Sequence, residues 1–195
     1  MLKLLRMQVH QQMVRHIIFR LFPIVFQMLP LLVLKIVLLG IIFAVAWIFL
    51  LGICRTGDES MNPAIRAGDL VIYDRLTHEY HMGDVVVIER DGDRQIRRVA
   101  AVSGDVVDVT EEGLNVNGYQ QQEADIYTET LPYKDGIDYP LTVGDGQVFV
   151  LGDNRDQSED SRNADIGNVK TEDIYGKAWF VSFPWENFGP IPKGQ

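Results

Sequence analysis

Hydrophobic positions divide the chain into an N-terminal apolar segment and a longer part with short, separated apolar runs. Ile36–Cys54 is a stretch of 19 residues without a charged side chain. As an α-helix it would be about 28 Å long, close to the thickness of the hydrocarbon core of a bilayer. The pattern therefore predicts a transmembrane helix at residues 36–54, preceded by a basic and apolar segment at residues 1–35 and followed by the main domain at residues 55–195.

The main domain has the pattern of hairpin-linked strands. Its apolar runs are rich in Val, Ile, Phe and Trp and are bounded by turn signals such as Gly-Asp and Asn-Gly, which is typical of an all-β domain. The predicted strands are Leu70–Tyr73, Val85–Ile88, Gln95–Val102, Val106–Thr110, Leu114–Asn117, Gln147–Leu151 and Ala178–Phe183. The predicted fold class is mostly β, a compact domain after an N-terminal transmembrane helix.

Three other segments of the main domain do not have a strand pattern. Asn168–Ile174 is compatible with one short helical turn. Gln120–Leu141 is polar and is predicted to be a surface excursion. The tail Pro184–Gln195 is rich in Pro and Gly and is predicted to end the fold without regular structure.

The apolar N-terminal region allows alternatives. A cleaved signal peptide has an apolar core of about 7–15 residues and a small-residue cleavage site, and Ile36–Cys54 is longer and lacks such a site, so an uncleaved anchor is favoured. Leu21–Leu34 is also apolar but contains Pro23 and Pro30, and it is either an interfacial helix or a second span. Five basic residues precede the anchor and Arg55 follows it closely. The excess of positive charge predicts a single-pass plasma-membrane protein with a cytoplasmic N-terminus and an extracytoplasmic main domain.

Charge is distributed unevenly between these parts. The chain has 18 basic and 27 acidic residues, and its first 55 residues carry six of the basic ones and no acid. The remainder therefore has a formal charge of −15, which argues against nucleic acid as a partner. Cys54 is the one cysteine, so no internal disulfide or cysteine-based zinc cluster is expected. The spacing of the four histidines is not typical of a metal site, and no cofactor is predicted.

Three polar stretches carry the candidate chemistry: Gly57–Ile65, directly after the anchor, Gln95–Val99 followed by Ser103-Gly104-Asp105, and Gly152–Arg162. Taken singly, each has an ordinary structural explanation as a loop, a strand with one solvated Arg, or an acidic turn. Together, and in this order after an anchor, they resemble the type I signal peptidase family of membrane-anchored serine peptidases.

The resemblance covers about residues 36–183 and rests on four motifs. The nucleophile motif of the family, Ser-Met-x-Pro, is present at Ser60–Pro63, and its Gly-Asp plus apolar strand is present at Gly83–Val87. The box Gly-Asp-Asn-x-x-x-Ser-x-Asp-Ser-Arg matches Gly152–Arg162 at every fixed position, and Gly176–Ala178 gives the closing Gly-Lys-Ala. The resemblance implies a compact form of the family, without a large inserted β-domain. It also implies a serine endopeptidase that cleaves the signal peptides of exported precursors after small residues, at Ala-x-Ala sites.

The resemblance also implies roles for individual residues. Ser60 would be the nucleophile, Ser158 the hydroxyl that orients the base, and Arg98 a structural residue after the base. The salt bridge that supports the box would join Asp160 and Arg162, with Asp153 in a supporting position. The walls of a shallow apolar pocket for small residues would be Met61, Ile65 and Ile96. The substrate would lie along Arg94–Val99 as an added strand.

Two residues depart from the family pattern. Arg97 stands where the family has its general-base Lys, and a guanidinium stays protonated, so it cannot accept the proton of Ser60. If Arg97 fills that site, a hydroxyl–guanidinium contact with Ser60 is expected. Asp58 lies where Gly or Ser is usual, and its carboxylate would oppose an oxyanion or pair with Arg97.

Smaller features bear on the same site. The loop after Arg162 is slightly longer than in the family. Other bases are less favoured: His78 and His81 lie in an inter-strand loop, and Lys170 and Lys177 suit surface or structural roles.

Two hypotheses about function remain open. The first is an active signal peptidase, which retention of Ser60, Met61, Ser158 and Asp160 favours. The second is a non-catalytic relative that binds or chaperones exported proteins, such as pilin subunits on a Gram-positive surface, which Arg97 favours. A self-cleaving repressor is disfavoured by the anchor and by the absence of the Lys. The expected partners are exported precursors with their signal peptides and the lipid bilayer.

Overall fold

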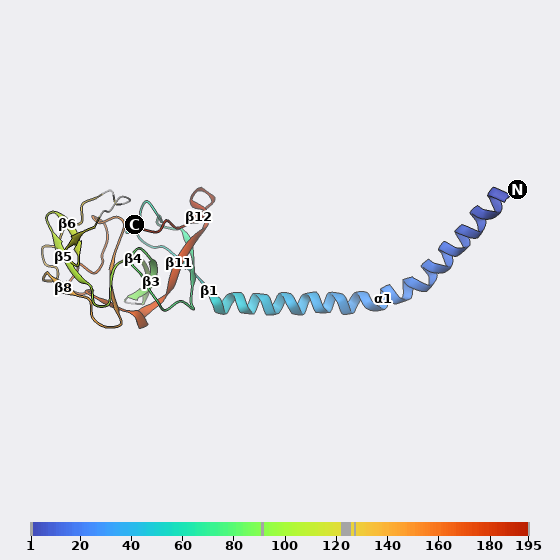
Figure 1. Ribbon diagram of the computed structural model, residues 1–195, viewed down its shortest axis with the longest axis horizontal. Helices are drawn as coiled ribbons and strands as arrows, with labels where there is room; N and C mark the ends of the chain where they lie inside the picture. Colours follow the sequence, from blue (N-terminus) through green and yellow to red (C-terminus); the bar gives the residue numbers. More distant parts are fainter. Residues whose placement is uncertain (1, 91, 122–125, 127, 195) are drawn as a thin grey trace. The chain divides into compact units, whose positions relative to one another are not determined.

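The computed structural model describes residues 2–90, 92–121, 126 and 128–194, and the chain divides into two compact units, residues 1–48 and residues 49–195 (Figure 1). The first unit lies within one long helix, α1, at Leu2–Leu50, whose last two residues belong to the second unit. Its segment Phe26–Leu50 has 25 residues, contains an 18-residue window with a mean hydropathy of 2.8, and is long and apolar enough to cross a membrane.

The helix differs from the sequence prediction at both ends of the apolar segment. It ends at Leu50, and Leu51–Arg55 is strand β1, so the predicted helix boundary at Cys54 is wrong. The physical reason is pairing, because all five residues of β1 pair antiparallel with the next strand. At the other side, Leu21–Leu34 continues in the same helix as Ile36, so it is not a separate helix in the described residues.

The second unit is built on two antiparallel sheets. The larger sheet has eight strands in the order β1-β2-β11-β3-β4-β9-β10, with β12 paired to β11, and the smaller has the order β7-β6-β5-β8. The strands of the larger sheet are β1 as above, β2 Leu70–Asp74, β3 Val85–Arg90, β4 Asp93–Val102, β9 Gln147–Leu151, β10 Val169–Lys170, β11 Ile174–Phe183 and β12 Gly189–Pro190. The strands of the smaller sheet are β5 Val106–Thr110, β6 Gly113–Val116, β7 Tyr119–Gln120 and β8 Leu141–Thr142. The mostly-β fold class and all seven predicted strands are confirmed.

Local chemistry accounts for several of the connections. Asn117 and Gly118 both have positive φ, at 54° and 80°, and form the tight turn between β6 and β7, as the Asn-Gly signal predicts. The predicted helical turn is present as the 3-10 helix η1 at Thr171–Asp173. Residues 120–121 and 128–141 are largely without regular structure, and residues 122–125 and 127 of the predicted excursion lie outside the described residues.

The tail is more ordered than its composition suggests. It contains the 3-10 helix η2 at Trp185–Asn187 and the strand β12, which pairs with β11. The backbone N–H of Ile191 donates to the carbonyl of Trp179 at 3.0 Å, and the Ile191 side chain is buried. The prediction of an irregular tail is therefore wrong, because burial of one apolar side chain and pairing with β11 order a segment that Pro and Gly would otherwise leave irregular.

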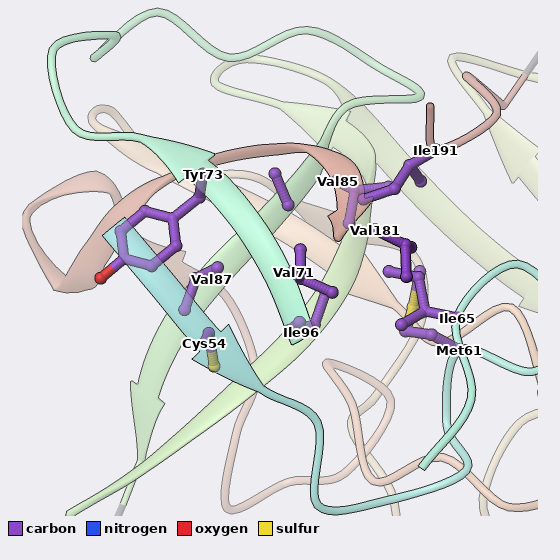
Figure 2. Packing of buried hydrophobic residues seen from close by; sticks show 11 residues of the cluster. Cys54, Met61, Ile65, Val71, Tyr73, Val85, Val87, Ile96, Val181 and Ile191 are labelled. Carbon is purple, nitrogen blue, oxygen red and sulfur yellow. The ribbon is translucent and has the colours of Figure 1, made fainter. Parts of the chain in front are cut away.

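The hydrophobic core under the candidate site is a cluster drawn from β1, β2, β3, β4, β11 and the tail. Figure 2 shows Ile191 beside Val85 and Val181, with Met61 and Ile65 in the same cluster. Residues far apart in sequence thus form one packed layer that supports the loop bearing Ser60.

Candidate active site

The loop that bears Ser60 and the box after β9 lie against each other. The backbone N–H of Asn154 donates to the carbonyl of Ser60 at 2.8 Å, and the Asn154 side-chain amide donates to the carbonyl of Glu59 at 3.1 Å. A side chain at Gly152 would collide with the carbonyl of Ser60 and the hydroxyl of Ser158, so Gly is needed for this close approach. The structure therefore brings together two motifs that lie about 90 residues apart in sequence.

Ser60 is buried, with 1% of its surface exposed. Its hydroxyl donates a long hydrogen bond of 3.4 Å to the carbonyl of Gln157. Its backbone N–H donates to Asp58 Oδ1 at 3.3 Å. Within the described residues, the hydroxyl therefore has a carbonyl as its partner, and a carbonyl does not accept the proton permanently as a general base would.

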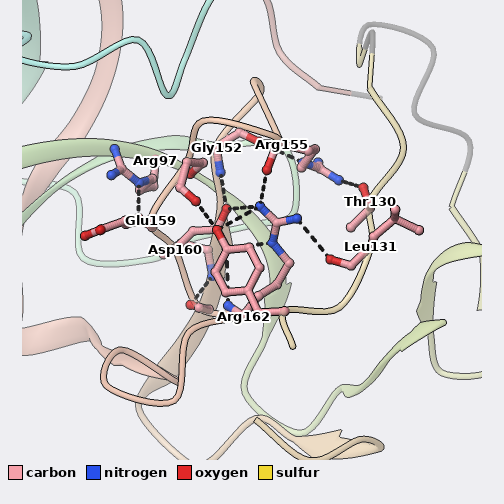
Figure 3. Close-up of polar contacts among 12 residues, drawn as sticks. Arg97, Thr130, Leu131, Gly152, Arg155, Glu159, Asp160 and Arg162 are labelled. Carbon is pink, nitrogen blue, oxygen red and sulfur yellow. Dashed lines mark hydrogen bonds and ion pairs between the residues drawn. The ribbon is translucent and has the colours of Figure 1, made fainter. Parts of the chain in front are cut away.

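Arg97 lies on β4 and points its guanidinium into the same region. The side chain is 1% exposed. Its Nε donates to the carbonyl of Glu159 at 2.9 Å, as Figure 3 shows, and its Nη1 donates to its neighbour's carbonyl, Ile96, at 2.7 Å. Its Nη2 donates to Asp58 Oδ2 at 3.1 Å and to Gln95 Oε1 at 3.2 Å.

The surroundings of Arg97 settle two expectations about contacts. The predicted pairing of Asp58 with Arg97 is present as an ion pair. The predicted contact between the guanidinium and the Ser60 hydroxyl is absent from the hydrogen bonds of the described residues, since that hydroxyl donates to Gln157 instead. The guanidinium donates instead to the carbonyls of Glu159 and Ile96 and to the side chains of Asp58 and Gln95.

Ser158 has an unusual environment for a polar side chain. Its hydroxyl is buried and has no hydrogen-bond partner among the residues that the structure describes. Buried hydroxyls without partners are costly and uncommon in folded proteins. The resemblance implies that this hydroxyl orients a lysine general base. Here Arg97 stands in place of that lysine and donates to other acceptors, so the Ser158 hydroxyl does not have the lysine as a partner.

A buried ion pair supports the box. Arg162 Nε donates to Asp160 Oδ1 at 2.9 Å, and both residues are almost fully buried, at 2% and 1% exposed (Figure 3). Asp160 Oδ2 also accepts the backbone N–H of Gly152 at 3.1 Å. Burial opposes the charge of Arg162, but the hydrogen bond and charge of Asp160 outweigh it and raise the pKa of Arg162. The geometry confirms the predicted Asp160–Arg162 pair.

Tyr133 closes the box from the irregular segment before β8. Its ring lies 4.5 Å from the guanidinium carbon of Arg162, and its hydroxyl donates to the carbonyl of Ser158. Burial raises the pKa of Tyr133, and the charge of Asp160 adds to the shift. Sequence reasoning missed this residue because a lone Tyr in a polar segment gives no signal of a partner so distant in sequence.

A second ion pair fixes β4 to the box and to the tail. Arg98 donates from Nε and Nη2 to the two carboxylate oxygens of Asp153, both at 2.7 Å. Its Nη1 donates to the carbonyls of Gly83 at 2.9 Å and Pro192 at 3.0 Å. The structural position expected for Arg98 and Asp153 is consistent with these contacts, whereas the contact with Pro192 had no sequence signal.

The three residues assigned to pocket walls lie in one cluster. Met61, Ile65 and Ile96 have 1%, 1% and 2% of their surface exposed and pack together with Val71, Val85 and Val181 (Figure 2). They belong to the buried core beneath Ser60, and Met61 and Ile65 lie in the same loop as Ser60. Their role toward a substrate stays a prediction.

The alternative bases have other partners or are exposed. Lys177 pairs with Asp84 at 2.6 Å and Lys170 with Glu172 at 3.1 Å. His81 lies 3.8 Å from Asp84, and its side chain is 75% exposed, while His78 is also exposed. Within the described contacts, none of the four is joined to Ser60 by a hydrogen bond.

The fold and this arrangement define a class, a membrane-anchored β-domain with a buried serine beside a buried cation. The family described as "Signal peptidase, peptidase S26" matches residues 29–183. The chain belongs to this family, a family of serine peptidases whose activity is signal peptide cleavage. With one apolar N-terminal helix long enough to span a membrane among its described residues, it is a single-pass membrane protein.

The chain is also similar to individual signal peptidases. Signal peptidase I of Bacillus licheniformis is 33% identical over 139 residues, which are 65% of this chain and 73% of that protein. Signal peptidase IB of Staphylococcus aureus is 31% identical over 148 residues, 67% of this chain and 76% of that protein. A crystal structure of a signal peptidase I from Enterococcus faecalis V583 is 27% identical, with a TM-score of 0.42, and the match covers 51% of this chain and 96% of that chain. None of these names supports pilin subunits as partners.

Proposed function

We propose that this chain recognises the signal peptides of exported precursors at Ala-x-Ala sites, and that its Ser60 site holds them without cleaving them by the route of a Ser/Lys peptidase. Membership of the signal peptidase family supports the substrate class. The close packing of Met61, Ile65 and Ile96 beneath Ser60 supports a preference for small residues, since tightly packed walls reject larger side chains by steric clash.

The observation that carries the proposal is the state of the base position. Arg97 is fully buried there and is held by Asp58 and two backbone carbonyls. A lysine in such a site becomes a base because burial lowers its pKa. A guanidinium stays protonated under the same burial. Ser60 is therefore left without a general base.

A second candidate is an active peptidase with a different base, and the retained Ser60, Ser158 and Asp160–Arg162 arrangement favours it. Without a base, oxyanion stabilisation and binding alone leave an acceleration of roughly 10³-fold over water. Such residual cleavage would not depend on Ser60, whereas cleavage by a peptidase with a different base would. The two candidates therefore differ in what a Ser60→Ala variant does.

The test uses the detergent-solubilised full chain and a fluorescent precursor peptide with an Ala-x-Ala site. A matched peptide carries Leu as the residue before the cut. We expect the Ala peptide to bind about tenfold more tightly than the Leu peptide, and Ser60→Ala to bind it equally well. Mass spectrometry of the incubated peptide should show no product beyond that with Ser60→Ala. Ser60-dependent product would support the second candidate, and a lack of binding would contradict both.

A further inference from the structure

The Asp58 carboxylate is bound by two hydrogen-bond donors, one for each oxygen. Its Oδ1 accepts the backbone N–H of Ser60 at 3.3 Å, and its Oδ2 accepts Arg97 Nη2 at 3.1 Å. The two donors come from the Ser60 loop and from β4. They bind one oxygen each, which is the pattern of a two-point carboxylate site.

The two partners of this ion pair differ in exposure. The Asp58 side chain is 42% exposed, whereas that of Arg97 is 1% exposed. The carboxylate can therefore turn outward into solvent, while the guanidinium stays fixed by the carbonyls of Glu159 and Ile96. When Asp58 turns away, the backbone N–H of Ser60 and one N–H of Arg97 Nη2 become available to another acceptor.

The donors that Asp58 would leave, the Ser60 N–H and the Arg97 guanidinium, favour a particular kind of ligand. In serine peptidases the backbone N–H of the nucleophile stabilises an oxyanion, so an oxygen with negative charge fits at the Ser60 N–H. A guanidinium is a strong carboxylate ligand and a non-functional base. An intact peptide bond would bring only a neutral carbonyl and would leave the buried cation without its counter-charge, which is costly. A free C-terminal carboxylate replaces Asp58 charge for charge.

We propose that Ser60 and Arg97 form a binding site for the C-terminal carboxylate of a peptide that ends in a small residue, such as a signal peptide already released by cleavage, and that this ligand displaces Asp58. The peptide class rests on the function proposed above. The side chain of the terminal residue would pack against Met61 and Ile65, which lie one and five residues after Ser60 and are 1% exposed, so only a small side chain fits there. An uncleaved precursor would bind beside Ser60 with Asp58 in place.

The experiment compares three fluorescent peptides on the full chain in detergent. The first ends in Ala-x-Ala with a free carboxylate, the second is the same peptide with a C-terminal amide, and the third continues past the Ala-x-Ala site. Fluorescence anisotropy at low salt gives the dissociation constants. Because one charge-assisted hydrogen bond is involved, we expect the acid to bind about tenfold more tightly than the amide.

The variants separate this site from a general effect of charge. Asp58→Asn removes the competing carboxylate and should increase the preference for the acid by a further factor of about ten. Glu59→Gln, a change of the same charge at the exposed neighbouring residue, should leave the preference unchanged. Arg97→Gln should bring the acid and the amide to equal affinity, and Ser60→Ala should keep the preference because the backbone N–H remains.

The outcomes distinguish this inference from the proposed function. Equal affinity for the acid and the amide peptide in both wild type and Asp58→Asn would contradict the proposed carboxylate site. This test does not depend on whether Arg97→Gln folds. If the third peptide still binds in that case, the proposed function stands alone. If none of the three peptides binds, both fail.

Discussion

Asp58 and Arg97 decide the chemistry that is available to Ser60. Asp58 accepts both the backbone N–H of Ser60 and Arg97 Nη2, and it supplies the counter-charge of the guanidinium. In the function proposed above, the guanidinium stands at the position of the base and the carboxylate at that of the oxyanion. Each substitution makes the other tolerable, because a buried guanidinium needs a carboxylate and a carboxylate beside Ser60 needs a cation. The two departures from the family pattern therefore act as one unit.

This coupling predicts how a base could be restored. In Arg97→Lys, a neighbouring Asp58 carboxylate stabilises the protonated amine, which raises its pKa and keeps it from acting as a base. In the double variant Arg97→Lys with Asp58→Ala, that stabilisation is lost and burial lowers the lysine pKa. We expect the rising limb of the pH profile of kcat/KM to lie at least about one unit lower in the double variant than in Arg97→Lys. Ser158, which has no partner in the described residues, would then receive a hydrogen bond from the lysine.

The control for this prediction is Ser158→Ala in the same double variant. Its pH profile should shift relative to the double variant, since the hydroxyl would no longer interact with the amine. Superimposable pH profiles for Arg97→Lys with and without Asp58→Ala would contradict the electrostatic coupling.

The buried pair of the box predicts a loss of stability. Asp160→Asn keeps the shape of the side chain but leaves the charge of Arg162 without its counter-charge at 2% exposure. We expect the free energy of unfolding to fall by about 3 kcal/mol, measured by urea denaturation in detergent. Glu172→Gln, which breaks the exposed pair with Lys170, should have no measurable effect. Equal behaviour of the two variants would refute the structural role of the box pair.

Secondary-structure elements bring these residues together in a way that the sequence reveals only in part. Val106–Thr110 and Gln147–Leu151 were predicted to the residue because β-branched runs between turn signals are local features. The box at Gly152–Arg162 was found because its motif is long. The strand at Leu51–Arg55 was missed because an apolar run after a helix reads as more helix, and only pairing with β2 makes it a strand.

Contacts between distant segments account for the rest of what was missed. The pairing of Asp58 with Arg97 was foreseen as one alternative, since opposite charges depart together from the family pattern. The missing partner of Ser158 and the bond from Arg98 to Pro192 depend on three-dimensional positions, and no pattern in one sequence specifies them.

The tail gives a test at the level of elements. Ile191 is 8% exposed and joins the cluster beneath the Ser60 loop. We expect Ile191→Ala to lower the free energy of unfolding by about 2 kcal/mol, because it removes apolar contacts with Val85 and Val181. Lys193→Ala, at an exposed position of the same tail, should change it little. A thermal or urea midpoint that is the same for both variants would show that the tail is dispensable.

For the whole molecule, the charge distribution predicts its orientation in the membrane. Basic residues before the span favour a cytoplasmic N-terminus, which puts the β-domain and Ser60 on the side where exported precursors emerge. In spheroplasts, added protease should remove a C-terminal epitope tag and leave an N-terminal tag intact, whereas after lysis both should be lost. Protection of the C-terminal tag in intact spheroplasts would reverse the orientation and exclude exported precursors as ligands.

The central claim is that Arg97 deprives Ser60 of its general base, and one measurement tests it most directly. Wild type, Ser60→Ala, and Arg97→Lys with Asp58→Ala are each incubated with an Ala-x-Ala precursor, and the initial rate of cleavage is measured at several pH values. The account predicts that wild type and Ser60→Ala cleave at the same residual rate. It also predicts that the double variant cleaves at least about 10²-fold faster than wild type, because a general base contributes at least that factor. Ser60-dependent cleavage by wild type at a rate equal to or above that of the double variant would contradict it.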